Sequence, residues 1–121
     1  MSYLVYKLIH LSGIFMILMS LAGMTMHVAT GGKKKTSLYK RAAIAHGIGM
    51  FVALLGGFGM LARLGIHWPW PGYIFVKVGI WVVMGGLITF IYKKPSKSTL
   101  FWNLTLVLAI AAGYLALMKP F

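Results

Sequence analysis

The sequence predicts an all-α integral membrane protein in which four helices form an up-down-up-down bundle. Two features of the composition lead to this prediction: 60% of the 121 residues are apolar, and Asp and Glu are absent, so every charged side chain is Lys or Arg. A soluble domain carries about a quarter charged residues of both signs. The third observation is that the apolar residues fall into four runs, and a helix needs roughly 20 such residues to cross a bilayer.

The four predicted spans cover residues 3–28, 42–64, 73–92 and 100–118. The first run has no basic leader and continues into His27 without a small-residue cleavage site, so we expect a retained helix and no signal peptide. Segments rich in Gly, Pro, Ser and Lys separate the spans, and residues of these types end helices. Such short links make neighbouring helices antiparallel, which predicts one transmembrane domain over residues 1–121.

The basic residues are unevenly distributed between the two sides of the predicted bundle. The first and third links and their flanks carry Lys33, Lys34, Lys35, Lys40, Arg41, Lys93, Lys94 and Lys97, whereas the opposite side carries Lys7, Arg63, Lys77 and Lys119. The positive-inside rule then places both links in the cytoplasm and both termini on the non-cytoplasmic side of a cell inner (cytoplasmic) membrane. The expected counter-charge is anionic lipid headgroups and not nucleic acid, because the cations lie in short loops between apolar runs.

Ionisable side chains inside the spans are the main candidates for function, because each costs several kcal/mol at membrane depth unless it is paired or reaches the surface. His10, His46 and Lys77 are such residues, and His27 lies near the end of the first span. With a rise of about 1.5 Å per residue, His10 lies roughly 10 Å below the outer boundary, in the same half of the bilayer as Lys77. We therefore expect an outer cluster of His10, Lys77 and His67, and an inner cluster of His27 and His46.

Each of these residues also has a purely structural interpretation. Lys77 can extend its ammonium group to the nearby surface, and His67 can be an interfacial residue beside the Trp-Pro-Trp-Pro loop. His27 can be a solvated boundary residue or a cap at the helix C-terminus. His10 and His46 lie too deep for an imidazole to reach water, so we favour ligation or a buried hydrogen bond for these two.

In the first three predicted spans, polar and small residues recur every three or four positions, so they share one face of each of these helices. These stripes are His10, Gly13, Ile17, Ser20 and Met24; His46, Gly49, Ala53, Gly56, Met60 and Arg63; and Lys77, Trp81, Met84 and Ile88. Because the stripe of the second span carries a polar side chain, we expect it to face protein. Small residues allow close helix approach in lipid, or they leave a slot for a flat macrocycle.

Neutral imidazole is a common axial ligand of haem iron, and antiparallel helices can present such ligands to one cofactor. We therefore predict a b-type haem held by His10, Lys77, His46 and His27, with His10 and His46 as the candidate iron ligands. The alternative metal is Cu(I), because Met24, Met26 and His27 offer soft ligands. The absence of carboxylate and thiol side chains excludes a Ser-His-Asp triad, a carboxylate-bound Mg²⁺ or Ca²⁺ site and an iron–sulfur centre.

Two short segments resemble a known family. Residues 3–10, which open the first span, and residues 72–81, which open the third, resemble the HemJ-type protoporphyrinogen oxidases and the related CopD-like membrane proteins. In HemJ-type enzymes a first-span histidine and a later-span lysine are important and b-type haem is bound, so the resemblance implies these roles for His10 and Lys77. We expect a haem protein in electron transfer or porphyrin redox chemistry. The alternative is a non-catalytic accessory or structural subunit that packs against other membrane subunits or against copies of itself.

Overall fold

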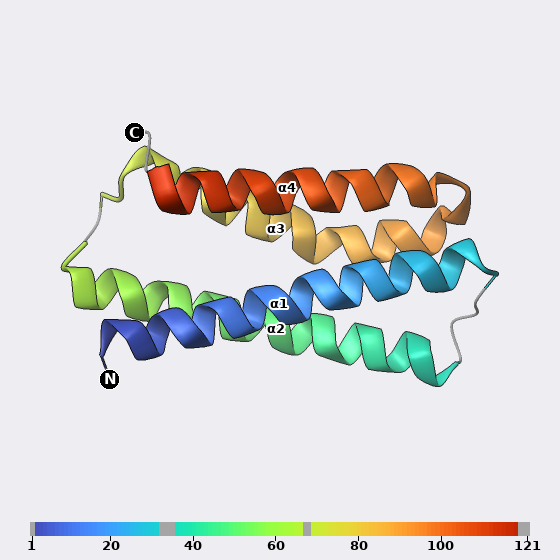
Figure 1. Cartoon of the computed structure of the whole chain (residues 1–121), viewed down its shortest axis with the longest axis horizontal. Helices are drawn as coiled ribbons and strands as arrows, with labels where there is room; N and C mark the ends of the chain where they lie inside the picture. Colours follow the sequence, from blue (N-terminus) through green and yellow to red (C-terminus); the bar gives the residue numbers. More distant parts are fainter. Residues whose placement is uncertain (1, 32–35, 67–68, 119–121) are drawn as a thin grey trace.

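Four long helices make up the computed structural model of the chain (Figure 1), which describes residues 2–31, 36–66 and 69–118. They are α1 (Tyr3–Ala29), α2 (Ser37–Leu64), α3 (Gly72–Lys93) and α4 (Ser98–Met118), with a short 3-10 helix, η1 (Pro95–Lys97), between α3 and α4. Each of the four long helices has the length and apolar composition needed to cross a membrane. The predicted all-α bundle of four spans is thus confirmed.

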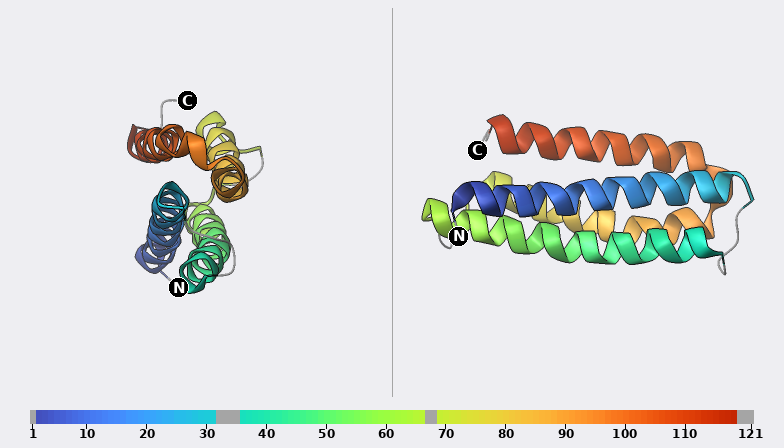
Figure 2. Two further views of the ribbon diagram at one scale, coloured as in Figure 1. Left: turned by 90° about the vertical axis from the view of Figure 1, so that its right-hand side faces the viewer. Right: turned by 60° about the horizontal axis from the view of Figure 1, so that its bottom comes forward.

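The helices run alternately up and down, so one end of the bundle holds the start of α1 and the end of α4 (Figures 1 and 2). We call this the terminal end. The opposite end, which we call the basic end, exposes the side chains of Lys40, Arg41, Lys93, Lys94 and Lys97. Helices α1 and α2 form the most extensive helix pair, and α1 also contacts α3, α4 and η1.

The observed helix bounds differ from the predicted ones mainly at α2, which begins at Ser37 and not at residue 42. Thr36 caps this helix, because its Oγ1 accepts the Tyr39 N–H at 3.2 Å. Hydropathy places the start too late because the first turns of α2 contain Lys40 and Arg41, which are helical but polar. Helix α2 ends at Gly65, whose φ of 72° is left-handed and suits glycine.

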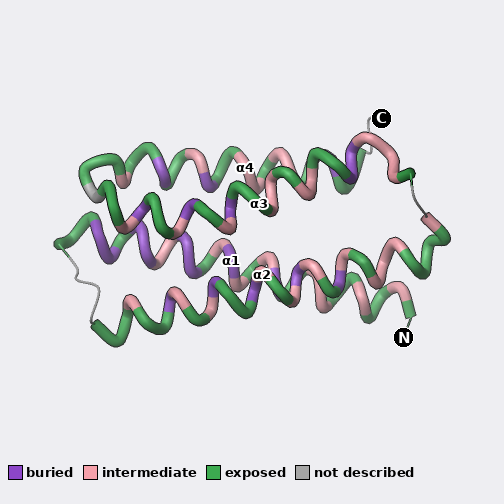
Figure 3. Tube along the Cα trace, turned by 180° about the vertical axis from the view of Figure 1, so that it is seen from behind, coloured by how far each residue is buried: buried purple, intermediate pink, exposed green. Residues whose placement is uncertain are grey.

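The core of the bundle is a narrow strip of buried residues along its axis, whereas much of each helix is exposed (Figure 3). Apolar residues from all four helices form this strip: Ile17, Leu21, Met24, Val28, Ala42, Ala53, Met84, Leu87, Ile91 and Phe101. Large hydrophobic side chains such as Phe15, Phe51 and Ile110 are more than 60% exposed. Apolar exteriors of this extent require lipid as the surrounding solvent, so the chain is a multi-pass membrane protein.

Helices α1 and α2 approach each other so closely that only glycine fits at several positions. A Cβ atom added to Gly56 would lie 2.6 Å from the Cα of His10, and one added to Gly13 would lie 2.7 Å from the Cα of Ala53. The predicted small-residue stripes of these two helices therefore face protein, as expected for α2. Their use is close helix packing. The slot for a macrocycle that the stripe of α2 also suggested does not exist between these helices, because α1 fills it.

Candidate functional site

His10 lies half-buried on α1 near the terminal end, with its ring against α2. Its Nδ1 is 2.7 Å from the main-chain oxygen of Ala53, and Cε1 and Nδ1 are both 3.4 Å from where a Cβ on Gly57 would lie. A carbonyl oxygen only accepts hydrogen bonds, so Nδ1 of His10 carries the proton and the neutral ring keeps its lone pair on Nε2. This is how the second nitrogen of a metal-binding histidine is commonly held.

Lys77 lies half-buried in the second turn of α3. The start of α3 lies at the terminal end (Figure 1). The structure places these two members of the predicted outer cluster toward the same end of the bundle, on helices that are far apart in the sequence. The third member, His67, lies outside the described residues.

His46 is buried on α2, and its Nε2 lies 3.0 Å from the main-chain oxygen of Met84 on α3. Because that oxygen only accepts, Nε2 is the protonated nitrogen of His46. Ala53, which holds His10, is seven residues farther along α2, a separation of about 10 Å along the helix axis. His10 and His46 therefore occupy different levels of the bundle and do not converge on one iron. For His46 the structure has the buried hydrogen bond that was the alternative to ligation.

His27 is buried in the last turn of α1, so the interpretation as a solvated boundary residue is wrong. Its Nε2 lies 3.1 Å from the Thr36 Oγ1, which also caps α2. The end of α1 is covered because the start of α2 lies directly against it. His46 lies ten residues beyond Thr36, roughly 15 Å along α2. The structure therefore does not bring His27 and His46 together as an inner cluster.

The indole of Trp81 donates a hydrogen bond between two helices, and the sequence pattern did not predict this contact. Its Nε1 donates to the main-chain oxygen of Met50 at 3.0 Å, which joins α3 to α2. The sequence signal for this contact is weak: an indole N–H inside a membrane needs an acceptor, but the residue type does not say which one. The same kind of contact therefore occurs three times. A ring N–H donates to a main-chain carbonyl of a neighbouring helix at His10, His46 and Trp81.

Comparisons with known proteins were made at three levels. No protein-family model, no curated protein and no solved structure matches this chain. The chemistry of the site therefore has to be inferred from its own geometry, and the likeness to HemJ-type enzymes stays a prediction.

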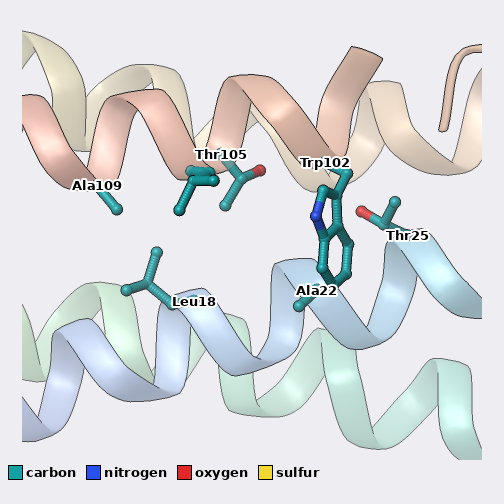
Figure 4. A pocket seen from close by; sticks show the side chains of 7 residues that line it. Leu18, Ala22, Thr25, Trp102, Thr105 and Ala109 are labelled. Carbon is teal, nitrogen blue, oxygen red and sulfur yellow. The ribbon is translucent and has the colours of Figure 1, made fainter. Parts of the chain in front are cut away.

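Two cavities lie away from His10 and Lys77. The first, about 230 Å³, separates α1 from α4 and is lined by Leu18, Ala22, Thr25, Trp102, Thr105, Leu106 and Ala109 (Figure 4). The hydroxyl groups of Thr25 and Thr105 donate to carbonyls of their own helices at 2.7 and 2.8 Å, so this cavity is largely apolar. The second, about 160 Å³, lies at the basic end between α2 and α3.

The three candidate ligands for Cu(I), Met24, Met26 and His27, do not converge on one point. Met24 is buried in the core whereas Met26 is 55% exposed, because residues two apart on a helix point to nearly opposite sides. His27, the third candidate, already bonds to Thr36 through Nε2. In the described ranges, no three His, Cys, Asp or Glu side chains gather in a metal-binding group. The Met24–His27 segment is therefore not a Cu(I) site in this conformation.

Replacing Trp81 with Phe is expected to lower the free energy of unfolding by about 1 kcal/mol, because the ring stays while the hydrogen bond to Met50 is lost. Denaturant unfolding in mild detergent, followed by circular dichroism, measures this loss. Trp102→Phe is the comparison variant, because Trp102 lines the cavity between α1 and α4 and is 45% exposed, whereas Trp81 is half-buried. Equal losses in the two variants would show that the indole N–H of Trp81 has no structural role.

Proposed function

We propose that this chain is an integral membrane b-type haem-binding protein that serves electron transfer or porphyrin redox chemistry, with His10 as the iron ligand. The observation that supports the proposal is the hydrogen bond from His10 Nδ1 to the Ala53 carbonyl. It fixes the tautomer and the plane of the ring, and it leaves the Nε2 lone pair for a metal. Neither His46 nor His27 has this arrangement, because each uses its Nε2 inside the bundle.

The residues around His10 fit the chemistry of haem in two respects. His10 supplies a neutral imidazole whose orientation is fixed by the protein, which is the usual proximal ligand of b-type haem. Lys77, toward the same end of the bundle, supplies a positive charge that would pair with a propionate or another acidic group of the porphyrin. When bound, the haem iron would supply one-electron transfer. Among the described histidines, the proposal now assigns the iron to His10 alone.

The absorption spectrum of the protein tests this proposal. The protein is expressed with added haem precursor, extracted in mild detergent and purified, and its Soret absorbance is compared with its pyridine haemochrome content. We expect about one haem per chain and a Soret band that shifts on reduction with dithionite. A colourless protein that also leaves the spectrum of added haemin unchanged would refute haem binding.

We also propose that the basic end faces the cytoplasm and the terminal end faces the outside of a cell inner membrane. The chain contains no Cys, so single cysteines report the topology directly. The thiol introduced in the Ser2→Cys variant is expected to react with a membrane-impermeant maleimide in intact cells. The thiol in the Lys97→Cys variant is expected to react only after the cells are permeabilised. The reverse pattern would invert the proposed orientation.

One observation favours the alternative function, a non-catalytic subunit of a larger membrane complex. Gly79 and Gly86 lie on the exposed side of α3, and a Cβ added to either would have nothing within 4 Å. Glycine costs about 1 kcal/mol in a helix relative to alanine, and here it gains no packing within the chain. A helix from a partner would explain both residues. This alternative predicts that Gly86→Leu abolishes co-purification of a partner, and that His10 variants keep it.

A further inference from the structure

We propose that the second cavity, between α2 and α3 at the basic end, is a binding site for one anionic phospholipid. We call this cavity the basic recess. Met24 lines it from α1, Tyr39 and Ala43 line it from α2, and Ile88, Thr89, Tyr92 and Lys93 line it from α3. Its volume of about 160 Å³ suits a phosphate group with the adjoining glycerol carbons. The acyl chains would then continue along the outside of the bundle.

The lining of the basic recess changes from polar to apolar along the helices. Lys93 ends α3, whereas Ile88 lies five residues earlier, about 7.5 Å deeper in the bundle. Lys93 and Tyr39 belong to the helical turns nearest the basic end, whereas Met24, Ala43, Ile88 and Thr89 lie about one turn or more deeper. This order matches a phospholipid, whose charged phosphate lies above its apolar chains.

Two tyrosine rings give the basic recess a fixed wall. The rings of Tyr39 and Tyr92 pack edge to face, with their centroids 5.1 Å apart and their planes at 66°. Such aromatic pairs hold their geometry, and they join α2 to α3 beside Lys93. Tyrosine at the membrane boundary presents an apolar ring to lipid and a hydroxyl to headgroups. The recess is therefore a shaped surface and not only a group of exposed lysines.

Charge complementarity identifies the occupant as anionic. The sequence contains no Asp or Glu, so no acidic side chain of this chain can neutralise Lys93. Lys40 and Arg41 follow Tyr39 on α2, and Lys94 follows Lys93, so the potential around the recess is positive. A lysine near a membrane surface strengthens anionic lipid binding by roughly fivefold.

The surroundings of the basic recess favour a lipid over a soluble phosphate. Ile44 on α2 and Phe90 on α3 are exposed and apolar at the levels of the lining residues, so the recess opens among surfaces that lipid covers. The cavity between α1 and α4 provides an internal comparison. No cation lines that cavity, so it can accept acyl chains but has no means of selecting a headgroup.

Native mass spectrometry of the purified protein tests the proposal. The protein is mixed with phosphatidylglycerol or with phosphatidylcholine of the same acyl chains, and the fraction that retains one lipid is measured. We expect phosphatidylglycerol to be retained at least fivefold more. Lys93→Gln is expected to remove most of that difference, because it deletes the charge and keeps a long side chain at the exposed end of α3. Lys97→Gln is the matched control, since it makes the same charge change at the same end but outside the recess.

Substitutions that fill the two cavities provide a second test of the proposal, which does not depend on charge. Ala43→Leu is expected to reduce phosphatidylglycerol retention as strongly as Lys93→Gln, whereas Ala109→Leu, which fills the cavity between α1 and α4, is expected to preserve it. Equal losses in Lys93→Gln and Lys97→Gln would mean diffuse attraction to basic residues, and the site would be wrong. Equal retention of both lipids, or displacement of the lipid by glycerol phosphate at millimolar concentration, would also overturn it. Circular dichroism of each variant confirms that the helices remain folded.

Discussion

His10→Ala is expected to abolish haem binding, with the dissociation constant for haemin raised on the order of 100-fold or more. The variant removes the Nε2 lone pair that the hydrogen bond to Ala53 holds in position, and loss of even an outer hydrogen bond to a metal ligand costs 10–100-fold. The measurement is a haemin titration of the purified variant, followed by Soret absorbance. The same titration gives the affinity of the unaltered protein.

His46→Ala is the matched control for this experiment. It removes another membrane-embedded imidazole, but the Nε2 of His46 donates to Met84 and is not available to a metal. We expect this variant to lose stability while its haem affinity stays within about threefold, since it removes a hydrogen bond and no ligand. If His46→Ala lost the Soret band and His10→Ala kept it, the ligand assignment would be wrong.

Gly56→Ala is expected to be the most destabilising of the single-methyl changes that we propose, with a loss of about 3 kcal/mol in the free energy of unfolding. The added Cβ would lie 2.6 Å from the Cα of His10. Because it meets main-chain atoms, no side-chain rotation relieves the overlap, and α1 must move away from α2. Denaturant unfolding in mild detergent measures the loss. The shift of α1 should also weaken haem binding, since it lengthens the His10 to Ala53 contact.

Gly79→Ala provides the control for the helix propensity of glycine. This residue is also helical, but nothing lies within 4 Å of its added Cβ. Alanine is a better helix former, so we expect unchanged stability or a gain of up to about 1 kcal/mol. Equal effects at Gly56 and Gly79 would contradict the close approach of α1 to α2.

The number of helices, their bounds and their buried faces were predictable because they depend on local properties of the chain. Three of the four helices begin and end within two residues of their predicted bounds, and only the start of α2 differs by more. That start depends on a single capping contact from Thr36, to which hydropathy is insensitive. The His46 stripe was correctly predicted to face protein, since spacing of three and four fixes one side of a helix.

For the residues of the candidate site, the sequence predicted only how deep each side chain lies in the membrane. Sequence position placed His10 and Lys77 in the same half of the bundle, and in the structure both lie toward the terminal end. It also placed His27 and His46 at similar depths, but these two bond to different partners at separate levels. Depth along a helix axis is a weak constraint on which side chains meet, because it does not determine how antiparallel helices are staggered or rotated.

The sequence alone determined that this protein crosses a membrane four times and which faces of its helices turn inward, because hydrophobic burial and helical periodicity are set residue by residue. The tertiary structure decided which ring nitrogen of each histidine forms a hydrogen bond within the protein. His10 donates through Nδ1 to Ala53, whereas His46 donates through Nε2 to Met84. That difference arises from where each ring meets a carbonyl of a neighbouring helix, which is a relation between segments more than thirty residues apart in the chain.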